Sequence, residues 1–141
     1  MTATVHATCV AIGGRGILIR GRSGSGKSDL ALRLIDRGAR LVSDDYTLLD
    51  QKDGRLRARP PETIAGRLEV RGVGLVDLPY ATEVPVCLLV ELDQVPERLP
   101  EAAKGVPLLD TVIPAIALAP LEASAPLKLE QALIRFGLPL P

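Results

Sequence analysis

The sequence has very few aromatic side chains. Only 2% of its 141 residues are Phe, Tyr or Trp, and tryptophan is absent. Proteins that bind single-stranded nucleic acid stack the bases on aromatic rings, so this scarcity argues against RNA or single-stranded DNA as a partner. The hydrophobic core must therefore be built from leucine, valine, isoleucine and alanine.

An excess of charge of one sign is also missing. The 17 Lys and Arg residues are balanced by 17 Asp and Glu residues, which argues against the basic surface that nucleic acids and anionic membranes attract. The longest hydrophobic run, residues 112–121, contains two prolines and is too short to cross a bilayer. The N-terminus lacks the basic and apolar regions of a signal peptide. We expect a cytoplasmic protein that binds neither nucleic acid nor membrane.

Cysteine is scarce as well. Cys9 and Cys87 are far apart and do not have the spacing of a metal-ligand pair. In a cytoplasmic protein we expect two reduced thiols in the core, with no disulfide. The length is close to the commonest size of one domain, which predicts a single domain over residues 1–141.

Short hydrophobic segments alternate with turns along most of the chain. We expect strands at residues 5–12, 17–19, 41–42, 86–92 and 112–118, a hairpin of residues 46–49 with 55–59, and a loop-rich edge at residues 96–107. Helices are expected at residues 27–37, ended by Gly38, and at residues 126–136, capped by Ser124 and ended by Gly137. This pattern predicts an α/β domain with a mixed sheet and few flanking helices.

One motif is specific enough to indicate a ligand. Residues 21–28 match the Walker A pattern of a P-loop: Gly21, Arg22, Ser23, Gly24, Ser25, Gly26, Lys27 and Ser28. They lie between a predicted strand and a predicted helix. The glycines let backbone N–H groups turn toward phosphate oxygens, and the helix adds its positive end. Lys27 is expected to be an exposed cation at the β- and γ-phosphates, and Ser28 a ligand of Mg²⁺. We predict that this loop binds ATP or a close relative.

Asp44 and Asp45 follow a predicted strand, which brings them to the sheet edge beside the P-loop. One carboxylate there can hold Mg²⁺, and another can accept a proton from an attacking hydroxyl or water. Neighbouring side chains of an extended segment point to opposite sides, so the two should differ in role. From these residues alone, a solvated turn remains an alternative.

Three further residues have ordinary explanations when each is taken alone. His6 is the only histidine and lies in an apolar segment, where a packed, hydrogen-bonded histidine is commoner than a site residue. Glu69 and Arg71 flank Val70. In an extended segment they share a face and could serve as metal ligand and phosphate clamp. An exposed salt bridge is the commoner explanation.

Taken together, these residues resemble the catalytic domain of HPr serine kinase/phosphorylase. The resemblance rests on four segments: residues 5–6, the P-loop at 21–28, residues 37–45 (RGARLVSDD) and residues 68–74 (LEVRGVG). It covers residues 5–77 well and residues 86–119 loosely. It implies the HPr kinase/PEP carboxykinase-like core, a P-loop-containing mixed sheet.

The resemblance also implies an activity. Members of this family use ATP and Mg²⁺ to phosphorylate a serine of HPr, the small phosphocarrier of the sugar phosphotransferase system. They also remove that phosphate with inorganic phosphate, which yields pyrophosphate. The matching positions imply a catalytic set of His6, Lys27, Asp45 and, on a weaker match, Arg98, with Ser28 and Glu69 as Mg²⁺ ligands. Asp45 would be the base of the kinase and the acid of the reverse reaction, in a homo-oligomer expected to be a hexamer.

The sequence departs from the family pattern in several places. Family members commonly carry an N-terminal regulatory domain, which this sequence does not include; Ala7 stands in place of a glycine, Asp29 in place of a glutamate, and the segment after Asp77 is shorter. These departures leave the phosphorylase activity and metabolite control open. Two other functions fit the same loop. One is a different P-loop ATPase or kinase, which has no need of residues 69–72, and the other is a non-catalytic nucleotide- or phosphate-sensing module.

Overall fold

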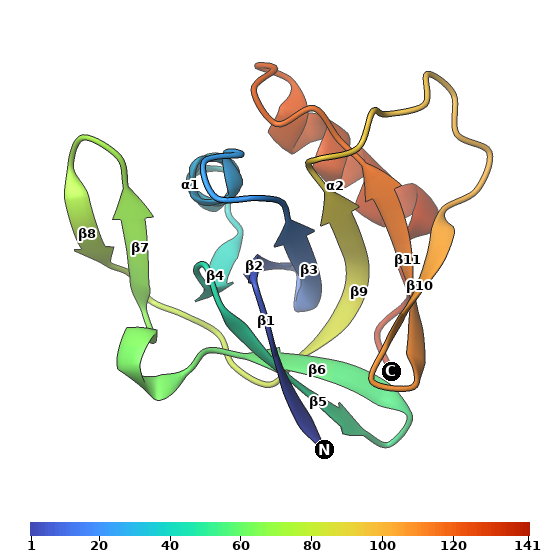
Figure 1. Ribbon diagram of the computed structural model, residues 1–141, viewed down its shortest axis with the longest axis horizontal. Coiled ribbons are helices and arrows are strands. Elements are labelled where there is room, and N and C mark those ends of the chain that lie inside the picture. Colours follow the sequence, from blue (N-terminus) through green and yellow to red (C-terminus); the bar gives the residue numbers. More distant parts are fainter.

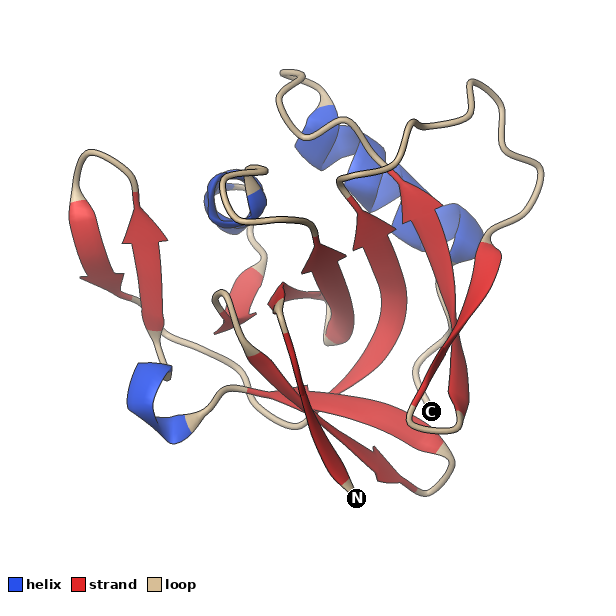
Figure 2. Cartoon of the chain, viewed as in Figure 1, coloured by secondary structure: helices blue, strands red, loops and turns tan.

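Strands make up most of this computed structural model, which describes residues 1–141 (Figures 1 and 2). The strands are β1 (Thr2–Val5), β2 (Ala7–Ile12), β3 (Arg15–Arg20), β4 (Arg40–Ser43), β5 (Thr47–Lys52), β6 (Arg55–Arg59), β7 (Arg67–Val70), β8 (Gly74–Asp77), β9 (Val84–Glu91), β10 (Lys104–Leu108) and β11 (Thr111–Ala117). The helices are α1 (Lys27–Asp36), the 3-10 turn η1 (Glu62–Ile64) and α2 (Ala125–Phe136). No helix is long and apolar enough to span a membrane.

Nine strands form one curled, mixed sheet (Figure 1). Its main path runs β1-β5-β6-β9-β3-β2-β4, and the β10–β11 hairpin joins through β11. Strand β9 is central, because it runs parallel to β3 and to β11 and antiparallel to β6. Strands β7 and β8 form a separate hairpin that packs beside α1. The predicted α/β mixed sheet with few helices is confirmed.

The central strands are buried on both faces. In β3, Ile17 and Ile19 belong to a cluster with α1 and α2, whereas Leu18 belongs to a second cluster on the opposite face with β5 and β6. Alternate side chains of a strand point to opposite faces, so a continuous apolar run is needed where both faces are covered. Each such side chain contributes about 1.5–3 kcal/mol on burial. These two clusters hold the carboxyl end of β3, and with it the P-loop, in place.

Helix α1 begins where its sequence predicts. Gly26 precedes it with a φ of 103°, a left-handed conformation that a glycine adopts without steric cost. Leu30, Ala31 and Leu34 form its buried face. The helix ends at Asp36, one residue from the predicted boundary.

The C-terminal helix is also present, and its predicted ends are confirmed to within one residue: α2 starts at Ala125 rather than at Pro126, and Gly137 follows its last residue. Ser124 makes no side-chain hydrogen bond to the first turn of α2. At the other end, the Arg15 guanidinium donates to the carbonyl oxygens of Leu133, at 3.2 Å, and Leu138, at 2.9 Å. The backbone N–H of Gly137 donates to the same Leu133 carbonyl at 3.0 Å, so a partner distant in sequence adds to the local cap at this end of the helix.

Two predicted segments, the loop at residues 96–107 and the strand at residues 5–12, differ from the structure in their strand assignment. The expected loop at 96–107 ends in strand β10, which includes Pro107; β10 pairs only with β11, and an edge strand tolerates a proline. The expected strand at 5–12 bends at His6 into β1 and β2. Strand β1 pairs with β5, whereas β2 pairs with β3 and β4. The bend therefore changes the strand partners.

Candidate active site

The end of β9 supports the start of the P-loop. The backbone N–H of Leu92 donates to the carbonyl of Arg20 at 2.8 Å, and Arg20 forms an ion pair with Glu91. Two residues after the end of each strand, the backbone N–H of Arg22 donates to the Asp93 carboxylate at 2.7 Å. The loop therefore leaves β3 in a defined direction.

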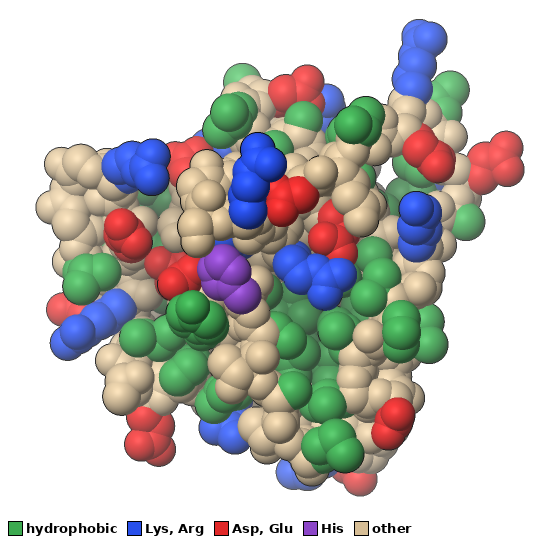
Figure 3. All heavy atoms as spheres, in the orientation of Figure 1, with side chains coloured by type: hydrophobic (Ala, Val, Ile, Leu, Met, Phe, Trp, Pro, Cys, Tyr) green, Lys and Arg blue, Asp and Glu red, His purple; other side chains and the backbone are tan.

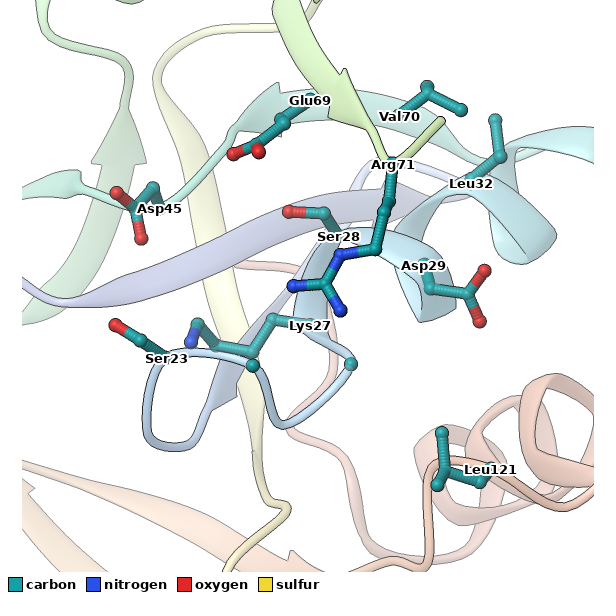
Figure 4. Close-up of a pocket in the computed structure, with 12 residues that line it drawn as sticks. Ser23, Lys27, Ser28, Asp29, Leu32, Asp45, Glu69, Val70, Arg71 and Leu121 are labelled. Carbon is teal, nitrogen blue, oxygen red and sulfur yellow. The ribbon is translucent and has the colours of Figure 1, made fainter. Parts of the chain in front are cut away.

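The P-loop opens on a cavity of about 490 Å³. That size suits a small-molecule ligand. The cavity is lined by Ser23, Gly24, Gly26, Lys27, Ser28, Asp29, Leu32, Asp45, Glu69, Val70, Arg71 and Leu121 (Figure 4). Two cationic side chains, two serine hydroxyls and a glycine-rich backbone are the donors that a phosphate chain needs. Of the predicted phosphate-binding residues, Gly21, Arg22 and Ser25 do not line it.

Lys27 is not the exposed side chain that the motif suggested. Its exposed fraction is 6%. The Nζ atom donates to the backbone carbonyls of Gly21, at 2.8 Å, and Arg22, at 3.1 Å. These carbonyls hold the ammonium group inside the curve of the loop, where a phosphate oxygen can reach it.

Asp44 is a buried hydrogen-bond acceptor that joins three elements. Its Oδ1 accepts from the hydroxyl groups of Ser28, at 2.6 Å, and Thr8, at 3.1 Å. Its Oδ2 accepts from the backbone N–H of Glu69 at 3.0 Å. The carboxylate thus ties α1, β2 and β7 together below the cavity. Because both carboxylate oxygens already accept hydrogen bonds, the role of Asp44 is to position the neighbouring residues of the site.

Asp45 is placed differently. Its side chain is 57% exposed and lines the cavity, and its Oδ1 lies 2.9 Å from Nε2 of His6. The His6 ring is on the molecular surface beside an acidic side chain (Figure 3), with its centroid 5.3 Å from that of Tyr46. A φ of 65° puts the Asp45 backbone in the left-handed region, which aspartate tolerates better than most residues. The two neighbouring aspartates therefore have different surroundings.

Thr8 connects these two aspartates, and the sequence analysis did not identify it. Its hydroxyl donates to Asp44 and accepts from the backbone N–H of Asp45 at 3.3 Å. The side chain is fully buried. Its one signal in the sequence is a polar residue within a strand that is otherwise hydrophobic.

Glu69 and Arg71 reach the cavity from the β7–β8 hairpin. Glu69 lies in β7, and Arg71 begins the turn that follows. Figure 4 shows the Arg71 guanidinium directed toward Lys27 and Ser28, and the Glu69 carboxylate on the side of Asp45. The hairpin therefore places an anion and a cation above the P-loop.

The donor set fits a magnesium ion only in combination with its ligand. Ser28 and Glu69 both line the cavity, but nowhere in the chain do three His, Cys, Asp or Glu side chains gather as a metal site. Mg²⁺ keeps several waters and commonly binds through one or two protein oxygens plus substrate phosphates. The residues present fit that mode of binding.

Arg98 is the one predicted catalytic residue that the structure leaves outside this arrangement. It is exposed, in the loop between β9 and β10, and does not line the cavity. The other predicted residues are brought together: Lys27, Ser28, Asp45 and Glu69 line one cavity, and His6 contacts Asp45.

Known sequences resemble about half of this chain. The HPr kinase/phosphorylase of Clostridium beijerinckii is 50% identical over 74 residues, which are 52% of this chain and 24% of that protein. The HPr kinase/phosphorylase of Clostridium novyi is 49% identical over 75 residues, 53% of this chain and 24% of that protein. The matched region spans about a quarter of these relatives.

A solved structure resembles the whole fold. The HPr(Ser) kinase/phosphatase of Coxiella burnetii superimposes with a TM-score of 0.83 at 29% sequence identity, and the match covers 94% of each chain. The family model described as the HPr Serine kinase C-terminal domain matches residues 1–119. The chain therefore belongs to the family of HPr serine kinase C-terminal domains.

Proposed function

We propose that this chain is a protein serine kinase that transfers the γ-phosphoryl group of ATP to a serine of HPr. One observation carries the proposal: the P-loop with Lys27 and the Asp45 carboxylate held by His6 face the same cavity. A phosphate-binding loop alone also serves ATPases and sensors. A carboxylate beside it that is exposed to an incoming hydroxyl is what phosphoryl transfer to serine adds.

The P-loop side of the cavity binds and orients the nucleotide. The loop amides, Lys27 and Arg71 hold the phosphate oxygens, and Ser28 and Glu69 would hold Mg²⁺. The metal ion would neutralise charge on the β- and γ-phosphates. Asp44 keeps the Ser28 hydroxyl in position through its 2.6 Å hydrogen bond. Most of the acceleration comes from this alignment and charge neutralisation.

Asp45 moves the proton. The serine oxygen bonds to the γ-phosphorus of ATP while the bond between that phosphorus and the β,γ-bridging oxygen breaks. The serine proton passes to the Asp45 carboxylate. ADP is the leaving group. His6 fixes the orientation of that carboxylate. In the reverse direction inorganic phosphate attacks phosphoserine, protonated Asp45 returns the proton to the serine oxygen, and pyrophosphate forms. The same residue thus supports the phosphorylase activity that we include in the proposal.

Four parts of the proposal extend beyond the cavity. We propose that residues 1–141 form one domain, because both core clusters draw on strands from both halves of the chain. The family resemblance supports a cytoplasmic protein that assembles as a homo-oligomer, a hexamer. Light scattering of the purified protein measures the number of subunits.

Arg98, exposed and outside the cavity, would contact HPr. For Arg98→Ala we expect a higher KM for HPr and unchanged ATP binding.

The test is incubation of the purified chain with ATP, Mg²⁺ and HPr, followed by mass spectrometry of HPr. We expect one phosphate on one serine, and none on an HPr variant with that serine replaced by alanine. Release of free phosphate without phosphorylation of HPr would instead identify a different P-loop ATPase. Binding of ATP without any turnover would identify a sensing module.

A further inference from the structure

The cavity has two chemically different ends. Asp45 and Ser23 lie at one end, whereas the three apolar lining residues, Leu32, Val70 and Leu121, lie toward the other (Figure 4). A nucleoside triphosphate has the same polarity along its length, with a charged phosphate chain at one end and a base with a large nonpolar face at the other.

Leu121 at the apolar end is unusually exposed and yet held in place. Its exposed fraction is 81%. The Arg33 guanidinium of α1 donates to the backbone carbonyls on either side of it, those of Pro120 and Glu122. Arg33 is fixed in turn by an ion pair with Asp29, at 3.1 Å. A leucine in an unrestrained loop could turn inward and bury its side chain. These contacts present it to the cavity.

The orientation of the nucleotide follows from Asp45. The γ-phosphate must lie beside this base for transfer to occur, so the rest of the nucleotide extends away from Asp45. The first turn of α1 lies in that direction, and Leu121 lies beyond it, close to Gly26 (Figure 4). An exposed leucine there gains burial when a nucleoside covers it.

We propose that Leu121 packs against the nucleoside part of the bound nucleotide and that Arg33 is its positioning residue. This inference rests on the proposed function, because it assumes a nucleoside triphosphate with its γ-phosphate at Asp45. It assigns a binding role to the segment between β11 and α2, which contains none of the site residues predicted from the sequence.

The test compares ATP with tripolyphosphate, which has the phosphates but no nucleoside. Binding of each to the full chain in the presence of Mg²⁺ is measured by isothermal titration calorimetry. For Leu121→Ala we expect affinity for ATP to fall about three- to tenfold, as expected for losing a few buried methyl groups. Affinity for tripolyphosphate should not change. Leu99→Ala is the matched control, because Leu99 is 83% exposed but does not line the cavity.

Arg33→Gln tests the positioning role. We expect the same selective loss of ATP affinity, and no further loss in the double variant with Leu121→Ala. Unchanged ATP affinity in Leu121→Ala overturns the proposal, and so does an equal loss for ATP and tripolyphosphate, which would place the effect on the P-loop. If Leu121→Ala shows the selective effect but the wild-type chain does not phosphorylate HPr, this inference stands and the proposed kinase activity fails.

Discussion

Oδ1 of Asp45 lies 2.9 Å from Nε2 of His6, although the residues are 39 positions apart in the sequence. Each lies at a bend between two strands, His6 between β1 and β2 and Asp45 between β4 and β5. Strand β1 pairs with β5 and β2 pairs with β4, which brings the two bends together. The catalytic pair that we propose is thus positioned by strand pairing on both sides.

Asp45→Asn retains the shape of the side chain but not its basicity. We expect phosphoryl transfer to HPr to fall by about a hundredfold or more, which is the usual contribution of a positioned base. ATP affinity should change much less, because the P-loop supplies the phosphate contacts. Steady-state kinetics and calorimetric ATP binding measure the two effects separately.

Asp44→Asn is the control for that experiment, with a different expected result. An amide nitrogen in place of one oxygen cannot accept a hydrogen bond, so a donor from Ser28, Thr8 or Glu69 is left without its partner. We expect a loss of about 1–3 kcal/mol in the free energy of unfolding, the penalty for an unsatisfied buried group. Normal transfer in Asp45→Asn together with loss in Asp44→Asn would reverse the two assignments.

His6→Gln removes the ring that holds the Asp45 carboxylate. We expect the turnover number to fall about tenfold or more while the KM for ATP stays nearly constant, because His6 does not line the cavity. Chemical denaturation should show little change, since the side chain is 38% exposed. An unaltered turnover number would show that His6 has no part in orienting Asp45.

Lys27→Met retains the aliphatic stem within the P-loop and removes the charge. Transfer should fall by more than about a hundredfold, as for other groups that stabilise developing charge. Because the ammonium also donates to two loop carbonyls, we expect a modest loss of stability, about 1 kcal/mol. Phosphoryl transfer at the wild-type rate in this variant would show that the Lys27 charge does not contribute to catalysis.

Burial of the Cys9 thiol is expected to make the free energy of unfolding decrease at alkaline pH. Complete burial raises the pKa of its thiol far above the value in the unfolded chain, which is about 8.5. The thiol's contribution to stability is therefore fully present below that value and decreases as the pH rises above it, because unfolding then releases a proton. Denaturation curves from pH 8 to 10 should show a smaller decrease for Cys9→Ala than for the wild type, and folded protein should resist alkylation of Cys9. Fast alkylation under native conditions would contradict the burial.

Arg15→Ala should destabilise the C-terminal helix. Its guanidinium makes three hydrogen bonds to the carbonyls of Leu133 and Leu138, so we expect a loss of about 1–3 kcal/mol in urea denaturation. Lys52→Ala, at an exposed position in β5, is the comparison. Equal effects of the two substitutions would show that Arg15 does not anchor α2.

The sequence alone determined the features that depend on neighbouring residues. The P-loop, the start of α1 after Gly26 and the hairpin at Gly54 follow from glycine conformations and from hydrophobic periodicity over a few residues. The mixed sheet follows from the arrangement of short apolar runs. In each case the physical cause is local sterics or a repeating pattern of burial.

Only the tertiary structure decided which side chains meet. Neither the contact of His6 with Asp45 nor the burial of Asp44 under Thr8 can be read from local pattern, because both depend on the pairing of strands that are distant in sequence. The exposed Leu121 is held by Arg33 across the surface of α1. These contacts depend on long-range packing, whose energy is shared among many residues and leaves little trace in any one segment.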